Sequence, residues 1–290
     1  MRVPLSNVFS RLRYLGATPP PLVPVVRLSG VIAAREVFGR SLSLLAVAAR
    51  LERAFRQRGA TAVALLINSP GGSPVQSALI GRRIRLLAEE TDLPVHVFVE
   101  DVAASGGYWL ACAGDDIHAD AASIVGSIGV LSASFGFPRL LERWGVERRV
   151  YTAGATKAQL DPFRPENPDD VARLRRLQDD IHADFKAWVK QRRGERLKGD
   201  DATLFEGEFW TGRRALELGL IDGIGHLRDV LRARYGKKVR TPLIGERRGF
   251  NPLRRLFGLR AASEIELGGS LTEGALIAVE ERAMWGRFGL

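Results

Sequence analysis

Two stretches of the chain decide its fold: TAVALLINSPGG at residues 61–72 and PVHVFVEDVAASGG at residues 94–107. Each begins as a short apolar run and ends in a glycine-containing turn. Such runs are typical of strands that are buried on both faces of a parallel sheet. Residues 75–90 and 108–113, which follow the two turns, have the composition of helices. The repeated order of strand, turn and helix predicts an α/β fold with a mainly parallel sheet.

The flanking sequence extends this pattern in both directions. We expect a first strand within residues 23–32, and short strands near Ile117 and within residues 124–131. We expect helices at residues 41–57 and 171–189, and a further helix within residues 210–222 that Gly219 ends. The helix at 171–189 is the clearest, because its apolar residues recur at spacings of three and four. We therefore divide the chain into an N-terminal arm (1–22), one α/β domain (23–230) and a C-terminal extension (231–290).

The positive charge of the chain is concentrated in that extension. The net charge is +10, and the window from Arg232 to Arg260 holds ten Lys or Arg residues and one acidic residue, Glu246. Arginines alternate with Phe and Leu within residues 247–260, which suits peripheral contact with an anionic membrane surface. A subunit contact and a solvated tail are the alternatives. We expect no nucleic-acid partner, because no recognised binding module accompanies the charge.

Other compositional features exclude several classes of protein. Cys112 is the single cysteine, so the chain has no intrachain disulfide, and its apolar surroundings indicate a buried side chain rather than a thiol nucleophile. The sequence has neither an apolar run long enough for a transmembrane helix nor a secretory signal pattern, so we expect a cytoplasmic location. We expect no metal and no cofactor, and we interpret residues 115–120 as a polar loop.

The two glycine-containing turns are the candidate site. Neighbouring parallel strands would place both turns at one edge of the sheet, where open α/β sheets bind ligands. Ser105 would begin a helix, where unpaired N–H groups can stabilise an oxyanion. A serine nucleophile also needs a base. None of the four histidines lies in a triad-like motif, whereas Lys157 lies in a neutral loop, VYTAGATKAQLDPF, at residues 150–163. The histidines are His96, His118, His182 and His226.

Six motifs occur in the order found in one peptidase family. They are residues 67–72, VAASGGY at 102–108, GSIGV at 126–130, residues 150–163, WTGRRA at 210–215 and GLID at 219–222. Together they resemble the signal peptide peptidase A family of S49-type serine peptidases, within the Clp protease and crotonase superfamily. The resemblance implies a crotonase-like fold of repeated ββα units. It also implies a homo-oligomer whose active sites are shared between subunits.

The resemblance further implies a role for each site residue. Ser105 would be the nucleophile and Lys157 the general base of a Ser–Lys dyad, and the amides of Gly72 and Gly106 would form the oxyanion hole. A lysine accepts a proton only when its amine is neutral, a state that burial favours. We therefore expect an apolar, largely closed pocket around Lys157.

The function that follows is a serine endopeptidase that hydrolyses small, unfolded or apolar peptides, such as remnant signal peptides. Two alternatives remain open. One is an acyl-CoA enzyme of the crotonase superfamily, which would use the two turns as a thioester oxyanion hole. The other is a non-catalytic, membrane-associated scaffold, which a Ser105→Ala variant with full cellular function would support.

Overall fold

The protein is described by a computed structural model at residues 19–34, 41–245, 279 and 282–290. A twisted sheet in the order β1-β2-β3-β4-β7 forms its centre, and β5 and β6 continue from β3. All neighbouring strands are parallel except β5 and β6. The predicted α/β class with a mainly parallel sheet is therefore confirmed. The strands are β1 (Val25–Ser29), β2 (Val63–Ser69), β3 (Val95–Ala104), β4 (Asp116–Ala119), β5 (Ile124–Gly126), β6 (Phe209–Thr211) and β7 (Gly223–Ile224).

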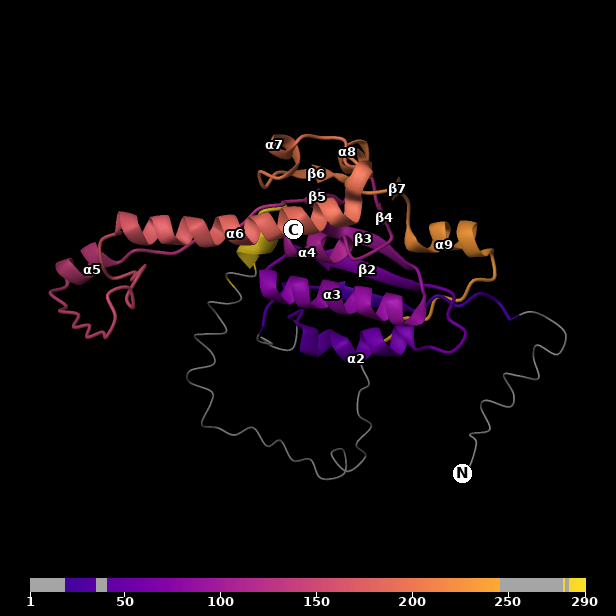
Figure 1. Ribbon diagram of the computed structural model, residues 1–290, viewed down its shortest axis with the longest axis horizontal. Coiled ribbons are helices and arrows are strands. Elements are labelled where there is room, and N and C mark those ends of the chain that lie inside the picture. Colours follow the sequence, from indigo (N-terminus) through magenta and orange to yellow (C-terminus); the bar gives the residue numbers. More distant parts are fainter. Residues whose placement is uncertain (1–18, 35–40, 246–278, 280–281) are drawn as a thin grey trace, which may run out of the picture.

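Helices cover one face of this sheet. In Figure 1, α2 (Leu44–Phe55) and α3 (Pro74–Thr91) lie side by side below the strands, and α4 (Gly106–Ala111) lies next to them. Alternate residues of β2, such as Leu65 and Ile67, are buried in the core between the sheet and these helices. The other face has a smaller apolar cluster, which includes Phe98 and Leu231 of α9 (Leu227–Tyr235). Burial on both faces explains why the first half of each deciding stretch is largely apolar.

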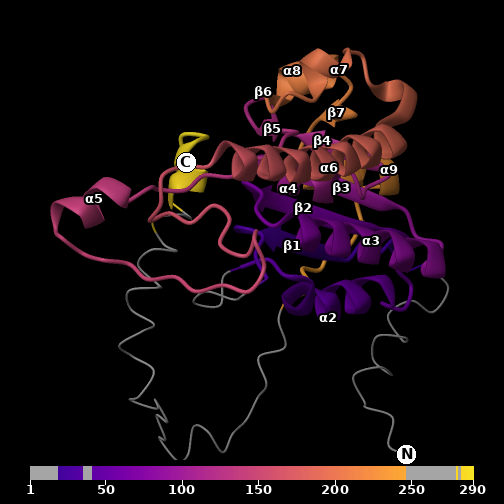
Figure 2. The ribbon, with the colours of Figure 1, turned by 60° about the vertical axis from the view of Figure 1, so that its left-hand side comes forward.

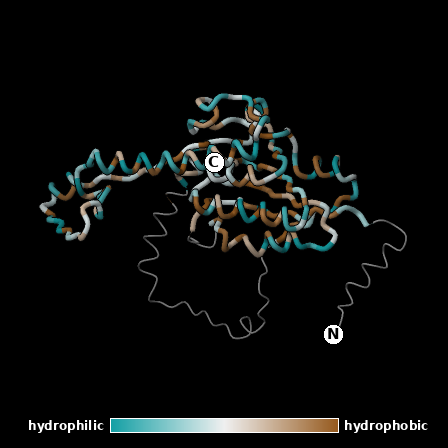
Figure 3. The backbone as a smooth tube through the Cα atoms, viewed as in Figure 1, coloured by the Kyte–Doolittle hydropathy of each residue, from teal (hydrophilic) through white to brown (hydrophobic). Residues whose placement is uncertain are grey.

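The longest helix, α6 (Pro168–Arg193), crosses the molecule above α4 and extends beyond the sheet. The segment that precedes it, residues 131–167, forms a projecting arm around α5 (Pro138–Arg143), and Figure 2 shows the arm displaced from the sheet. Figure 3 shows that hydrophobic segments gather in the sheet and its covering helices, whereas the outer part of α6 is largely hydrophilic. Several large apolar side chains of the arm are nevertheless exposed, among them Phe135, Trp144 and Tyr151.

The structure changes two details of the predicted elements. The helix expected within 210–222 begins at Gly212 rather than Trp210, because Phe209–Thr211 form strand β6 against β5. It ends at Glu217 as α8, just before Gly219, where the sequence predicted its end. In the predicted strand region 124–131, only Ile124–Gly126 form a strand. A 3₁₀ turn (Gly194–Arg196) and helix α7 (Asp201–Leu204) link α6 to β6.

The predicted boundary between residues 230 and 231 falls inside α9. Beyond that helix the chain returns along β1, where the N–H groups of Val23 and Val25 donate to the carbonyls of Arg240 and Pro242. Residues up to 245 therefore pack on the α/β domain. The basic segment 247–260 lies outside the described residues. Within the part of the chain that the structure describes, no helix combines the length and apolarity needed to cross a membrane.

Candidate active site

The two glycine-containing turns meet, as the sequence predicts. Strands β2 and β3 are parallel neighbours, with Ser69 opposite Ala103, so their ends lie at the same edge of the sheet. The contact is so close that a Cβ on Gly71 would lie 2.7 Å from the Cβ of Ser105 and 2.9 Å from the amide nitrogen of Gly106. Gly71 also has a φ of +105°, which favours glycine.

Ser105 stands in a strained backbone conformation between β3 and α4. Its φ is 52° and its ψ is −122°, values that a residue with a Cβ seldom adopts. The N–H of Ser105 donates to the carbonyl of Gly126 at 2.8 Å, which fixes the turn to strand β5. The side chain makes no capping hydrogen bond to α4, and the residue is partly exposed. The Ser105 hydroxyl is therefore presented to a pocket of about 360 Å³.

Two backbone N–H groups next to Ser105 have no hydrogen-bond partner among the described residues. They belong to Gly72 and to Gly106, the first residue of α4. Both glycines are sterically required, since a Cβ on Gly72 would lie 2.1 Å from the carbonyl oxygen of Ile32 and one on Gly106 would lie 2.4 Å from the Ser77 hydroxyl. Unpaired amides beside a nucleophile are the arrangement that stabilises an oxyanion.

The pocket also contains polar residues that the sequence did not single out for it. Ser127, from the GSIGV motif, lines it opposite Ser105 and has a φ of 53°. His182 of α6 lines it too, and its Nε2 lies 3.2 Å from the carbonyl oxygen of Ile128. Two exposed charged residues, Glu206 and Arg287, complete this polar lining. The pocket therefore combines hydroxyl groups, an imidazole and charges of both signs.

Lys157 is not part of this pocket. It lies in the projecting arm, its side chain is exposed, and its backbone N–H donates to Gly154 in a local turn. The described residues do not form the closed, apolar surroundings that we predicted for this lysine. Within one chain the structure therefore brings together Ser105, Gly72 and Gly106 and leaves Lys157 apart from them.

The remaining histidines serve other contacts. His96 and His118 flank the carboxylate of Asp116, at 2.9 and 3.4 Å. Burial raises the pKa of Asp116, but its contacts with these two histidines and the hydrogen bond that Arg234 donates outweigh burial and hold the pKa well below its usual range. The interpretation of residues 115–120 as a polar loop is wrong, because Asp116–Ala119 form strand β4 beside β3 and Asp116 belongs to a structural network. No metal-binding cluster is found within the described ranges.

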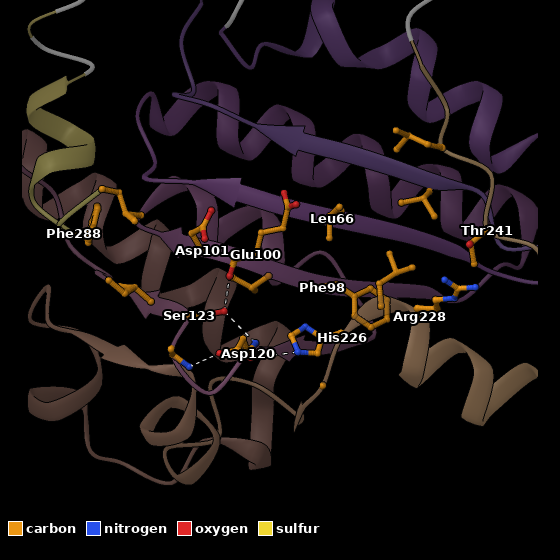
Figure 4. Close-up of a pocket in the computed structure, with 18 residues that line it drawn as sticks. Leu66, Phe98, Glu100, Asp101, Asp120, Ser123, His226, Arg228, Thr241 and Phe288 are labelled. Atoms are coloured by element: carbon orange, nitrogen blue, oxygen red, sulfur yellow. Dashed lines mark hydrogen bonds and ion pairs between the residues drawn. The ribbon is translucent and has the colours of Figure 1, made fainter.

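His226 lies beside a different pocket, on the sheet face that α2 and α3 leave uncovered. This pocket has a volume of about 850 Å³, and Figure 4 shows its floor of β2 and β3 side chains, including Leu66 and Phe98. His226 lies 3.4 Å from Asp120 at its rim. Ser105 does not line this pocket, so His226 is not placed to act on that serine.

The GLID motif at 219–222 has a structural role in the fold. The carboxylate of Asp222 accepts the N–H of Ile117 and both terminal nitrogens of Arg193, whose side chain is 2% exposed. Burial raises the pKa of Asp222, but its hydrogen bonds and the charge of Arg193 outweigh burial and lower that pKa. Asp222 thereby connects strand β4 to the end of α6.

Comparisons with known proteins point to one family. The model of peptidase family S49 matches residues 88–240, which include Ser105 and Lys157. The chloroplastic serine protease SPPA of Arabidopsis thaliana is 33% identical over 170 residues, or 57% of this chain and 24% of that protein. A Haemophilus influenzae protein named Probable protease SohB is 30% identical over 176 residues, or 61% of this chain and 49% of that protein.

A stronger match carries a different name. A Brucella abortus protein named Na(+)/H(+) antiporter NhaA is 55% identical over 273 residues, which are 92% of this chain and 37% of that protein. Most of the Brucella protein therefore lies outside the similarity. The chain spans less than two thirds of the length of each of these three relatives.

Proposed function

The chain belongs to peptidase family S49, and on that premise we propose that it is a serine endopeptidase with Ser105 as nucleophile and Lys157 as general base. The observation that carries this proposal is the strained Ser105, held beside the unpaired amides of Gly72 and Gly106 in an open pocket. The antiporter name of the Brucella relative is not carried over, because the similarity covers 37% of that protein.

The proposed reaction begins when the Ser105 hydroxyl oxygen attacks the carbonyl carbon of a peptide bond. Its proton passes to the neutral amine of Lys157, and the amides of Gly72 and Gly106 bind the resulting oxyanion. Collapse of this intermediate breaks the C–N bond, and Lys157 returns the proton to the leaving amine. A water molecule, deprotonated by the same lysine, then hydrolyses the acyl-enzyme.

Lys157 must reach Ser105 from a second copy of the chain in this proposal. Within one chain it is exposed on the arm, and the arm carries exposed apolar side chains such as Phe135 and Trp144 that a second copy could bury. The apolar surroundings that keep a lysine neutral would then be formed at the contact between subunits. A homo-oligomer with shared active sites would result.

Ser127 is the natural partner for the incoming amine. It lines the Ser105 pocket, and its backbone N–H is already held by the carbonyl of Glu208 at 2.7 Å. We assign to its hydroxyl the role of accepting one N–H from Lys157, which would orient the amine lone pair toward Ser105.

The proposed substrates are small or unfolded peptides, with remnant signal peptides as one class. The pocket beside Ser105 has a volume of about 360 Å³ and exposed residues at its edge, so it suits an extended chain rather than a folded domain. The predicted cytoplasmic location and the contact of 247–260 with an anionic membrane surface would bring the enzyme to such peptides, and both remain predictions.

The test is reaction of the purified protein with a fluorophosphonate probe, with modified residues identified by mass spectrometry. We expect labelling of Ser105 in the wild type, and loss of labelling in Ser105→Ala and in Lys157→Ala. His182→Ala is the matched comparison, because His182 is a possible base within the same chain. We expect His182→Ala to retain most of the labelling.

Each contrary outcome identifies a different error. If Lys157→Ala is labelled like the wild type and His182→Ala is not, His182 is the base and the dyad is wrong. If an oligomeric preparation shows no labelling at Ser105, the non-catalytic scaffold replaces the peptidase. Thioester hydrolysis or hydration without peptide cleavage would instead favour the acyl-CoA alternative.

A further inference from the structure

A segment far from the catalytic motifs forms one wall of the Ser105 pocket. Residues 282–290 end the chain in a short helix and turn, and Arg287 from this segment lines the pocket together with Ser105 and Ser127. Sequence motifs gave no indication of this placement, because 182 positions separate Ser105 from Arg287 (287 − 105).

Arg287 is held there by its neighbour Phe288. The Phe288 side chain is 8% exposed and packs on Val102 and Ala104, the strand β3 residues that lead into Ser105. It also meets the ring of Phe209 edge-on, with 5.1 Å between centroids. Because Phe288 is anchored to the same strand that positions the nucleophile, the backbone of Arg287 has a defined place beside the pocket.

The guanidinium of Arg287 lies 5.9 Å from the centroid of the neighbouring Phe288 ring, a contact that leaves its charge available to a ligand. The salt bridges found within the described ranges involve neither Arg287 nor the other charged residue of the pocket, Glu206. Glu206 lies in the loop between α7 and β6, so it approaches the pocket from a different element. An anionic group bound at Arg287 would be attracted by the guanidinium and repelled by Glu206.

We propose that Arg287 is a specificity-determining residue, which selects peptides that carry a carboxylate next to the bond attacked by Ser105. The proposal rests on the peptidase function proposed above and adds the chemical class of the neighbouring substrate residue. This substrate class differs from the apolar peptides expected from the sequence, because the pocket is lined mainly by polar and charged side chains. Glu206 weakens the selection by its opposite charge.

The test is digestion of unfolded casein, with every cleavage site identified by mass spectrometry. The quantity measured is the ratio of acidic to basic residues within two positions of the cleaved bond, after subtraction of sites that Ser105→Ala also produces. For Arg287→Glu we expect this ratio to fall about fivefold, which corresponds to about 1 kcal/mol, the upper end for an exposed ion pair. Arg287→Gln should give a smaller fall, and Glu206→Gln should raise the ratio.

Arg282→Glu is the matched control. Arg282 is an exposed arginine of the same segment that does not line the pocket, so its variant has the same net charge as Arg287→Glu and should cleave with the wild-type ratio. An unchanged ratio in both Arg287 variants, with normal probe labelling of Ser105, would overturn the selectivity and leave the peptidase intact. If the ratio falls as much in Arg282→Glu as in Arg287→Glu, the selectivity is overturned as well. If wild type and Ser105→Ala produce the same sites, the peptidase function itself fails, and this inference fails with it.

Discussion

Gly71 sets how closely the two turns of the site approach each other. Any side chain there would collide with the backbone that carries the nucleophile, since its Cβ would lie 2.7 Å from the Ser105 Cβ and 2.9 Å from the Ala104 carbonyl oxygen. We predict that Gly71→Ala displaces Ser105 and lowers the rate of probe labelling at least tenfold. The left-handed backbone of Gly71 adds a stability cost of about 1–2 kcal/mol.

The Gly59→Ala variant separates the displacement of Ser105 from the stability cost of the backbone conformation. Gly59 has a similarly positive φ of +81°, but a Cβ there would have no atom within 4 Å. In urea unfolding, the Gly59→Ala variant should therefore have a lower free energy of unfolding than the wild type. The probe should still label its Ser105 at the wild-type rate. Wild-type labelling by a folded Gly71→Ala variant would show that the spacing of the turns does not control the nucleophile.

Cys112 gives a second prediction at the residue scale. Burial raises the pKa of its thiol to about 12, so at pH 8 the thiol remains protonated, and the thiolate is the reactive form. We predict no reaction with iodoacetamide over an hour in the native protein and complete reaction after unfolding in guanidinium chloride. Rapid native labelling would revive the interpretation of Cys112 as a nucleophile.

At the residue scale, the sequence predicts those parts of the site whose residues lie close together along the chain. Ser105 and its glycines could be predicted because a strand, a turn and a helix start within a few residues of one another. Ser127, His182 and Arg287 could not be placed in the pocket, because they come from separate segments. The pairing of β5 with β3 brings Ser127 to Ser105, and the packing of α6 and of Phe288 brings His182 and Arg287.

At the scale of elements, Asp222 and Arg193 join the end of α6 to strand β4. Arg193 is buried and Asp222 is partly exposed, so removing the Asp222 charge leaves a buried guanidinium without compensation. We therefore predict that Asp222→Asn lowers the free energy of unfolding by about 3 kcal/mol at pH 7, the lower end for a fully buried pair. The folded-state pKa of Asp222 is depressed, so its stabilisation is present above the unfolded pKa of about 3.9 and is lost as pH falls below it.

Urea unfolding from pH 7 to pH 3.5 measures this difference. The gap between wild type and Asp222→Asn should be constant above about pH 5 and should narrow below about pH 4, as Asp222 of the unfolded wild-type chain takes up a proton that the folded chain does not. Asp229→Asn on α9 is the control, because Asp229 is exposed and has no salt bridge to another described residue. A gap that widens in acid would contradict the assigned direction of the shift.

Elements differed in how well the sequence predicted them. The strands β2 and β3 were predictable because burial on both faces makes most of their residues apolar. The start of α8 was misplaced because Trp210 fits a helical pattern as well as a strand, and its pairing with Val125 of β5 depends on a long-range contact. Short elements of this kind are decided by their tertiary partners rather than by local propensity.

For the whole molecule, the decisive feature is that Lys157 and Ser105 belong to different parts of one chain. The arm that carries Lys157 extends away from the sheet, as Figures 1 and 2 show. Neither spacing nor composition predicts this separation, since oligomeric contacts leave no local pattern. If a second copy of the chain completes each site, two variants that each lack one catalytic residue should regain activity when they are mixed. A site formed within one chain would not regain activity in this way.

Mixing two inactive variants tests this. Ser105→Ala retains Lys157, and Lys157→Ala retains Ser105, so an oligomer that contains both can form complete sites at contacts between unlike subunits. With equal amounts and random assembly, a site needs the serine from one variant and the lysine from the other, so we predict recovery of about a quarter of wild-type casein cleavage. Each variant alone should remain inactive at every concentration.

The result depends on exchange of subunits, so the variants are mixed in urea and refolded together, and native mass spectrometry confirms mixed oligomers. A matched mixture of Ser105→Ala with a double variant, Ser105→Ala/Lys157→Ala, contains no complete pair and should stay inactive. If mixed oligomers form and the first mixture is also inactive, Ser105 and Lys157 do not act together across subunits. In that case Lys157 would have to act on the Ser105 of its own chain, and the proposal of active sites shared between subunits would be wrong. His182, which lines the same pocket, becomes the candidate base only if Lys157→Ala by itself is active.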